Sequence, residues 1–303
     1  MSLDNNNEDG KGLIAIISDI HANKKALDIV LDDISHRKIK RIVCLGDIIG
    51  YGKDPIYVVD QARMEIFEEV LKGNHDEGSE MVSQANMSAK GIANLIHVNN
   101  AAAETIVEHT KTLQELNNNG EPSEEGEARI DYLRDLPEDP VQIRDDVLCV
   151  HAPIGKDGMR KYAMTWEFAE EYGIKNITDI CMKPEKLFAD KTYFPEGKRI
   201  LFVGHTHMHY AYIDDGEDIY EFKFERETTS SDGQKSEVER FIPLRDDERI
   251  IVNVGAVNDS RMKDKSFINI AKEKKFEADT PIYYSILHPD KIEFVEIYYN
   301  PNI

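Results

Sequence analysis

Short apolar segments alternate with longer amphipathic segments in the first quarter of the chain. Residues 13–18 and 42–45 are short, apolar and rich in β-branched side chains, which is typical of buried strands. Residues 25–36 repeat apolar side chains at helical spacing, and residues 55–67 begin a second helix with a proline in its first turn. A third strand begins at residue 70. This β-α-β-α-β order predicts a parallel sheet covered by helices.

The rest of the chain continues with helical patterns and then mainly with strands. Residues 101–116 and 128–136 are predicted helices. Predicted strands cover 147–150, 200–203 and 250–254, and a terminal hairpin covers 282–286 and 292–297. Two segments interrupt this pattern as insertions, a partly helical one near 155–197 and a solvated β excursion near 214–249. We therefore expect a disordered tail over residues 1–12 and a single domain over 13–303.

Composition and charge narrow the function classes. The chain has 303 residues with 37 Lys+Arg and 58 Asp+Glu, so its net charge is −21. Such a surface repels long nucleic acids, which makes them poor candidate partners. No apolar run is long enough for a membrane span, and the first residues lack the pattern of a secretory signal. Three widely spaced cysteines form no disulfide framework, and we expect a cytoplasmic protein.

Polar side chains follow the apolar strands at the points where the strands end. They are two aspartates, one asparagine and five histidines: Asp19, His21, Asp47, Asn74, His75, His151, His205 and His207. The carboxyl ends of parallel strands meet at one edge of a sheet, where ligands bind. Imidazole and carboxylate groups are common ligands of transition metals. The sequence therefore predicts a metal site at this edge.

The spacing of these residues adds detail. In an extended segment, side chains two residues apart point the same way, so Asp19 with His21, and His205 with His207, can reach one site. Asp47 follows a glycine and is suited to bridge two cations. Two metal ions about 3.5–4 Å apart stabilise the attacking and leaving oxygens of an in-line phosphoryl displacement. The pattern is consistent with such a pair.

Five blocks in this order resemble the calcineurin-like metallophosphoesterases. The blocks are Asp-x-His at 19–21, Gly-Asp at 46–47, Gly-Asn-His-Asp at 73–76, His151, and Gly-His-Thr-His at 204–207. Residues 17–23, 46–52 and 253–257 further resemble the small bacterial and archaeal phosphodiesterases of this superfamily. The resemblance implies an α/β fold, a four-layer α/β/β/α sandwich of two mixed sheets flanked by helices, with a dinuclear metal site between the sheet edges.

The resemblance also implies how the ligands are shared. One metal would take Asp19, His21, Asp47 and His207. The other would take Asp47, Asn74, His151 and His205, so that Asp47 bridges the two. We expect two divalent transition-metal ions, with manganese as the first candidate and iron, nickel, cobalt or zinc as alternatives.

Four further residues are candidates for the reaction. The resemblance makes His75 the general acid for the leaving alkoxide. Asp76 either orients His75 or caps a helix N-terminus, and the two interpretations have equal weight. Asn23 is a candidate for binding substrate. Arg261 either contacts the substrate phosphate or forms a surface ion pair.

The chain departs from some relatives in ways that matter. Where protein Ser/Thr phosphatases and symmetrical dinucleoside-tetraphosphate hydrolases carry Asp-Arg-Gly, residues 50–52 read Gly-Tyr-Gly, so that phosphate-binding arginine is missing. Tyr162 and Trp166 form either a lid or, as we favour, the small core of the first insertion. His109 has no motif around it and is expected to be solvated, as are His36, His97 and His288.

Together these features predict a metal-dependent phosphodiesterase that hydrolyses small phosphodiesters or nucleotides by in-line attack of a metal-bridging hydroxide. A phosphomonoesterase or nucleotide pyrophosphatase of the same superfamily is one alternative. A non-catalytic interaction scaffold on the same fold is another. The expected partner is a small phosphate-ester substrate, with no membrane contact, and the sequence does not indicate an oligomeric state.

Overall fold

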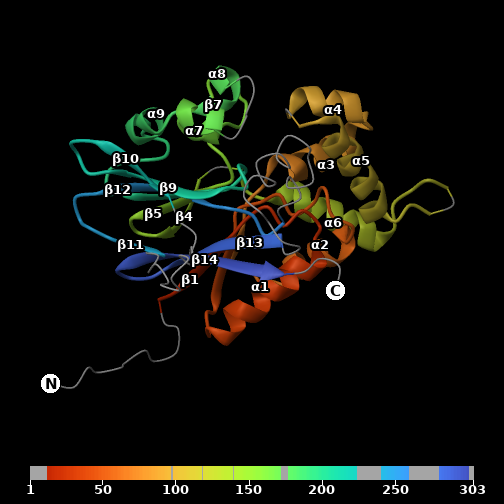
Figure 1. The fold of residues 1–303 in the computed structure, drawn as a ribbon. Coiled ribbons are helices and arrows are strands. Elements are labelled where there is room, and N and C mark those ends of the chain that lie inside the picture. The colour runs from red at the N-terminus through yellow and green to blue at the C-terminus, as the bar shows by residue number, and fades with distance from the viewer. Residues whose placement is uncertain are drawn as a thin grey trace, which may run out of the picture.

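The computed structural model describes residues 12–96, 98–117, 119–138, 140–171, 177–223, 240–258 and 280–299. Within these ranges the chain forms two mixed β-sheets flanked by helices, which confirms the predicted fold class (Figure 1). Residues 1–11 of the predicted tail and Arg261 lie outside the described residues. The predictions made for them, and the division into one domain with two insertions, stay predictions.

The first sheet contains the start and the end of the chain. Its strands lie in the order β11 (Phe241–Pro243), β14 (Lys291–Tyr299), β13 (Thr280–Leu287), β1 (Ile14–Ile17), β2 (Arg41–Cys44) and β3 (Glu69–Val70). Strands β1, β2 and β3 are parallel, and they are connected through α1 (Lys24–His36) and α2 (Pro55–Arg63), as predicted. Helix α2 ends earlier than predicted, because the backbone at Glu65 turns left-handed (φ 57°).

The second sheet is built from the later strands. Their order is β10 (Ile219–Lys223), β9 (His209–Asp214), β12 (Arg249–Val254), β8 (Ile200–Val203), β5 (Val147–Val150) and β4 (Val141–Arg144). Strands β5, β8 and β12 are parallel neighbours, whereas β4 and β9 pair antiparallel with them. The parallel strands therefore bring their carboxyl ends to one edge, as they do in the first sheet.

Alternation along the strands produces the layers. Ile14 and Ile16 pack between the two sheets with Phe202, whereas Ala15 and Ile17 face the other way and pack against α1. Every side chain in β1 is thus buried, which explains why this strand is apolar throughout. Helix α1 and helices α7 to α9 lie on opposite sides of the two sheets (Figure 1).

Four helices follow β3 and pack on one another. They are α3 (Asn74–Ala85), α4 (Ala89–Leu95), α5 (Asn100–Gln114) and α6 (Glu124–Asp135). Helices α5 and α6 were predicted, but α6 begins four residues earlier, because Ser123 caps it by accepting the N–H of Gly126 at 2.9 Å. The sequence did not predict α3 and α4, whose few buried apolar residues form a small separate cluster with α5.

The described part of residues 155–197, the segment predicted to be the first insertion, covers the outer face of the second sheet. It contains β6 (Tyr162–Ala163), α7 (Trp166–Glu171), α8 (Ile177–Ile180), β7 (Cys181–Met182) and α9 (Pro184–Ala189). Tyr162 packs at the edge of its apolar cluster, as predicted. Trp166 does not, because it is 39% exposed and its ring lies under the ammonium group of Lys183.

The second insertion spans both sheets. Its described residues form β10, which pairs with β9, and β11, which pairs with β14 of the other sheet. The predicted terminal hairpin is confirmed as β13 and β14. Among the described residues, none of the helices combines the length and the apolar character that crossing a bilayer requires.

Candidate metal centre

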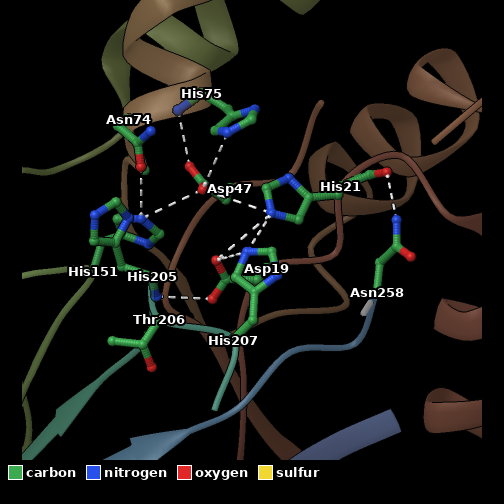
Figure 2. Close-up of polar contacts among 12 residues, drawn as sticks. Asp19, His21, Asp47, Asn74, His75, His151, His205, Thr206, His207 and Asn258 are labelled. Atoms are coloured by element: carbon green, nitrogen blue, oxygen red, sulfur yellow. Dashed lines mark hydrogen bonds and ion pairs between the residues drawn. The ribbon is translucent and has the colours of Figure 1, made fainter. Parts of the chain in front are cut away.

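Side chains from both sheets meet where the parallel strands end (Figure 2). Asp19 and His21 follow β1, Asp47 follows β2, Asn74 and His75 begin α3 after β3, His151 follows β5, and His205 and His207 follow β8. Asp19 connects the residues from the two sheets, since its Oδ2 atom accepts the backbone N–H of His205 at 3.0 Å. The structure thus brings together all seven predicted ligands and His75.

The backbone at these residues is not the extended one that the spacing argument assumed. Left-handed dihedral angles occur at Asp19 (φ 55°), His21 (48°), Asp47 (54°), His205 (66°) and His207 (62°). The residues converge through these turns and not through strand alternation. The prediction that Asp19 with His21, and His205 with His207, reach one site from an extended backbone was therefore wrong. Side chains other than glycine rarely adopt such angles, and their concentration here is typical of a functional site.

Asp19, His21 and His207 form one group of ligand atoms. Their Nε2 and carboxylate atoms all lie within 4.8 Å of one another. His207 Nε2 is 3.1 Å from Asp19 Oδ1 and 2.9 Å from His21 Nε2, which is itself 3.7 Å from Asp19 Oδ1. All three residues are buried. This geometry matches three of the four ligands predicted for the first metal.

Asp47 lies at the centre of the remaining ligands. Its Oδ2 atom is 3.8 Å from His21 Nε2 and 3.5 Å from His151 Nε2. His151 Nε2 is in turn 3.2 Å from Asn74 Oδ1, and His205 belongs to the same group of ligand atoms as Asp47 and His151. Asp47 therefore touches both halves of the cluster, which is the position a bridging carboxylate needs.

The hydrogen bonds of two histidines fix which nitrogen carries the proton. Nδ1 of His21 donates to the carbonyl of Ile49 at 2.9 Å, and Nδ1 of His151 donates to the carbonyl of Leu45 at 2.9 Å. A neutral ring then directs the Nε2 lone pair into the cluster.

Those lone pairs face other acceptors. Nε2 of His151 points at Asn74 Oδ1 and at the Asp47 carboxylate, and all of these atoms carry partial or full negative charge. Electron pairs that face one another in a buried site repel unless a cation lies between them. The donor set of oxygen and imidazole nitrogen therefore fits a divalent transition metal.

Burial and neighbouring charges shift the pKa values of the groups in the cluster. Burial and the negative charges of Asp19 and Asp76 raise the pKa of Asp47 well above its usual value. Burial would also raise the pKa of Asp19, but the charge of His207 and its hydrogen bond to Asp19 outweigh it, so this pKa is lowered. Burial lowers the pKa of His151 to about 3, so its ring is neutral at pH 7. The ionised form of Asp47 is therefore disfavoured unless a cation lies beside it.

His75 is held beside this carboxylate. Its backbone N–H donates to Asp47 Oδ1 at 2.9 Å, and its Nε2 atom is 4.0 Å from Asp47 Oδ2 (Figure 2). Gly50 allows the ring to lie here, because a Cβ atom at that position would come within 2.1 Å of His75 Nδ1. His21, Asp47 and His75 form a third group of ligand-type atoms. The imidazole thus lies at the edge of the cluster, within reach of a group bound there.

Asp76 has a structural role in the described contacts. One of its oxygens accepts the N–H groups of Gly73 and Asp47 at 2.9 Å, and the other accepts the N–H of Ile48 at 3.0 Å. These contacts support the interpretation of Asp76 as a cap, which bonds to the backbone at the start of α3 and to the turn that carries Asp47. An orienting role toward His75 stays a prediction. Burial raises the pKa of Asp76 to about 6.

Asn23 is also engaged by the fold. It caps α1, with Oδ1 accepting the N–H of Ala26 at 3.1 Å, and its Nδ2 donates to the hydroxyl of Tyr299 at 3.0 Å. Its predicted contact with substrate stays a prediction. The side-chain amide of Asn258 also contacts the segment after β1, since it donates to the His21 carbonyl at 3.3 Å.

His109 was expected to be solvated and is instead buried. From α5 its Nδ1 atom accepts the N–H of Gly50 at 3.1 Å, and its Nε2 atom donates to the carbonyl of Gly52 at 3.2 Å. It thereby fixes the loop whose central residue, Tyr51, packs its ring 4.8 Å from that of His21. No local motif indicates this role, because His109 follows the loop by more than fifty residues.

Comparison with known proteins agrees with this geometry. The model of the calcineurin-like phosphoesterase family matches residues 12–229, a range that contains the whole cluster. Uncharacterised protein MJ0912 of Methanocaldococcus jannaschii is 53% identical over 68 residues, which is 22% of this chain and 28% of that relative. The matched stretch thus spans little more than a quarter of that relative's length.

A solved structure of a metallophosphoesterase from Sphaerobacter thermophilus covers 95% of this chain and 89% of its own, with 21% identity and a TM-score of 0.54. At this identity the likeness shows a shared fold. The family match is broader, since it covers more than two thirds of the chain and all of the converging ligands. The chain belongs to the calcineurin-like phosphoesterases, a family of metal-dependent hydrolases that act on phosphate esters.

Proposed function

We propose that this protein is a metal-dependent phosphodiesterase that hydrolyses small phosphodiesters or nucleotides. The observation that carries the proposal is the cluster around Asp47, where the buried Nε2 lone pairs of His21 and His151 face the Asp47 carboxylate and Asn74 Oδ1 faces Nε2 of His151. Bound divalent ions would activate water and neutralise charge on the phosphoryl group. Two ions with Asp47 between them, held by the ligand sets predicted above, account best for this arrangement.

The residues of the cluster have two roles, metal binding and proton donation. Asp19, Asp47 and the four inward-facing histidines (His21, His151, His205 and His207), with Asn74, hold the ions. His75 supplies a proton to the departing oxygen, because its Nε2 atom lies 4.0 Å from Asp47 at the edge of the cluster. An alkoxide is a poor leaving group unless it is protonated, so a diester of this kind benefits from such an acid.

Charge supports the choice of substrate and partner. With a net charge of −21, the protein repels long polyanions, while a small diester can still reach a cationic centre. Manganese is our first candidate metal, and the donor set also accepts iron, nickel, cobalt or zinc. The three unpaired cysteines, Cys44, Cys149 and Cys181, support a cytoplasmic location.

The test is hydrolysis of a generic aryl phosphodiester and of the matching monoester with Mn²⁺, beside a chelated control. Faster cleavage of the diester, lost on chelation, is the expected result. Preference for the monoester would assign the protein to the phosphatases. If neither is hydrolysed by protein that demonstrably contains metal, the general phosphodiesterase assignment fails.

A further inference from the structure

The chain makes a tight hairpin directly after the candidate ligand His151. Ile154 and Arg160 pair across this hairpin as an antiparallel bridge. It is closed by the N–H of Gly155, which donates to the Met159 carbonyl at 2.7 Å. The hairpin thereby brings Arg160 back toward the metal cluster.

The side chain of Arg160 is buried although it carries a full charge. Only 8% of its surface is exposed. Its ionic contact within the described part of the chain is with Glu77, whose Oε2 atom lies 3.5 Å from Arg160 Nη2. Glu77 lies in the first turn of α3, the helix that begins with Asn74 and His75. Arg160 therefore lies between the hairpin and the helix that carries two residues of the cluster.

Most of the donors of this guanidinium are unused. Among the residues that the structure describes, no acceptor forms a hydrogen bond with Nε or Nη1 of Arg160. An arginine stays charged at every physiological pH, and leaving buried charged donors unpaired costs free energy. The surface salt bridge of Arg41 with Glu68, by contrast, has hydrogen bonds from both Nε and Nη2. Arg160 is thus arranged for an acceptor that the chain itself does not provide.

Two elements that carry candidate ligands hold Arg160 beside the cluster. Its hairpin begins three residues after His151, and its partner Glu77 lies in the same first turn of α3 as Asn74 and His75. The guanidinium therefore lies beside the half of the cluster that contains Asn74 and His151. An anion that reaches these residues also comes under the influence of Arg160.

We infer that Arg160 binds the phosphoryl group of the substrate through its non-bridging oxygens. The planar fork of a guanidinium matches two phosphate oxygens. The first insertion would then supply the phosphate-binding arginine that the Gly-Tyr-Gly sequence at residues 50–52 lacks. Glu77 is the positioning residue, because its carboxylate contacts Nη2 and leaves Nε and Nη1 for the phosphate. This inference rests on the proposed phosphoesterase function.

The experiment compares Arg160→Gln and Arg160→Lys with the wild type. Binding of inorganic phosphate to the Mn²⁺-loaded protein is measured by calorimetry, with metal content, thermal stability and kcat/KM for the aryl diester measured in parallel. Arg144→Gln is the control, since Arg144 pairs with Asp146 at the edge of the second sheet, away from the cluster. Glu77→Gln tests the positioning role.

We expect Arg160→Gln to weaken phosphate binding about ten- to a hundredfold while metal content stays unchanged. Arg160→Lys should keep the charge and recover part of the loss, and it also serves if the glutamine variant does not fold. Glu77→Gln should weaken binding by a smaller factor. Arg144→Gln should leave phosphate binding as in the wild type.

Two results would overturn the inference: wild-type protein that binds no phosphate, or variants of Arg160 that bind it as the wild type does. A loss of stability alone in those variants would show that Arg160 only anchors the hairpin to Glu77. The proposed function fails separately, if the wild type binds phosphate through Arg160 but hydrolyses neither ester. Unchanged phosphate binding by the variants of an active enzyme would remove the inference and keep the function.

Discussion

Nε2 of His21 lies 2.9 Å from Nε2 of His207. The Nδ1 proton of His21 is committed to the carbonyl of Ile49, so its Nε2 atom carries a lone pair. The Nε2 atom of His207 also lies 3.1 Å from Asp19 Oδ1, so in the metal-free protein a single proton must serve two acceptors. A divalent cation satisfies all three groups at once. The residues that define the site are thus also residues that the metal should stabilise.

Metal binding should therefore raise the melting temperature. A free-metal concentration 100 times the dissociation constant stabilises the native state by about 2.7 kcal/mol. Calorimetric melting with Mn²⁺, and again after chelation, measures the effect. If the two melting temperatures coincide, the cluster does not bind this metal.

The variant Asp47→Asn tests metal binding separately from the stability of the metal-free protein. Because burial and neighbouring carboxylates raise the pKa of Asp47, its ionised form opposes folding at pH 7. The variant without metal should therefore melt no lower than the wild type, since an amide oxygen can still accept the N–H of His75. Its response to Mn²⁺ should be largely lost. Asp218→Asn, at an exposed turn, is the matched control and should respond as the wild type does.

His75→Ala should lower turnover about 10²- to 10⁴-fold while the metal content stays as in the wild type. The reason is that His75 lies at the edge of the cluster, with Nε2 4.0 Å from Asp47 Oδ2, where it can reach a leaving oxygen. Turnover of a phosphodiester with an alkyl leaving group and metal analysis on the same sample provide the two readouts. If turnover and metal content fall together, His75 is a ligand and not the acid.

Asp76→Ala should destabilise the fold by at least about 2 kcal/mol, measured by guanidinium chloride unfolding. The substitution leaves the buried N–H groups of Gly73, Asp47 and Ile48 without their acceptor. Glu104→Ala, on the exposed side of α5, is a control that should cost far less. A variant with normal stability and lost turnover would instead support the role in catalysis first considered for Asp76.

The ligands were predictable because their chemistry is local in the sequence. Each follows a strand whose apolar residues mark it, so the ends of β1, β2, β5 and β8 could be placed before the structure. The positions of Asp19, Asp47, His151 and His205 at the sheet edges then follow from the positions of those strand ends. Even here the left-handed turns were missed, because no pattern of side chains reports the backbone angle of an aspartate or a histidine.

The supporting residues were not predictable in the same way. His109 and Arg160 act through contacts with distant backbone or with another element, so neither apolar periodicity nor spacing reports them. For Asp76 the sequence indicated a cap but not the bonds to the turn that carries Asp47. Helix α3 was missed because its first turn consists of polar residues such as Asn74 and His75, which are buried by the site and not by an apolar stripe. The physical signal of such residues is burial, and burial is a property of the fold.

His109 provides a prediction that depends on pH. Its Nδ1 atom must stay unprotonated to accept the N–H of Gly50, and burial lowers its pKa below the usual value. In the unfolded chain its pKa is about 6.5. Because the folded pKa is the lower of the two, the contribution of His109 to stability is fully present above about pH 6.5 and is lost as the pH falls below it.

The NMR titration of His109 should accordingly have a midpoint below 6.5. Between pH 7 and pH 5 the free energy of unfolding should fall more steeply in the wild type than in His109→Gln, in which this group is absent. The comparison cancels the carboxyl groups, since both proteins share them. A midpoint at or above 6.5, the value for the unfolded chain, or equal slopes in the two proteins, would contradict the neutral and buried role assigned to His109.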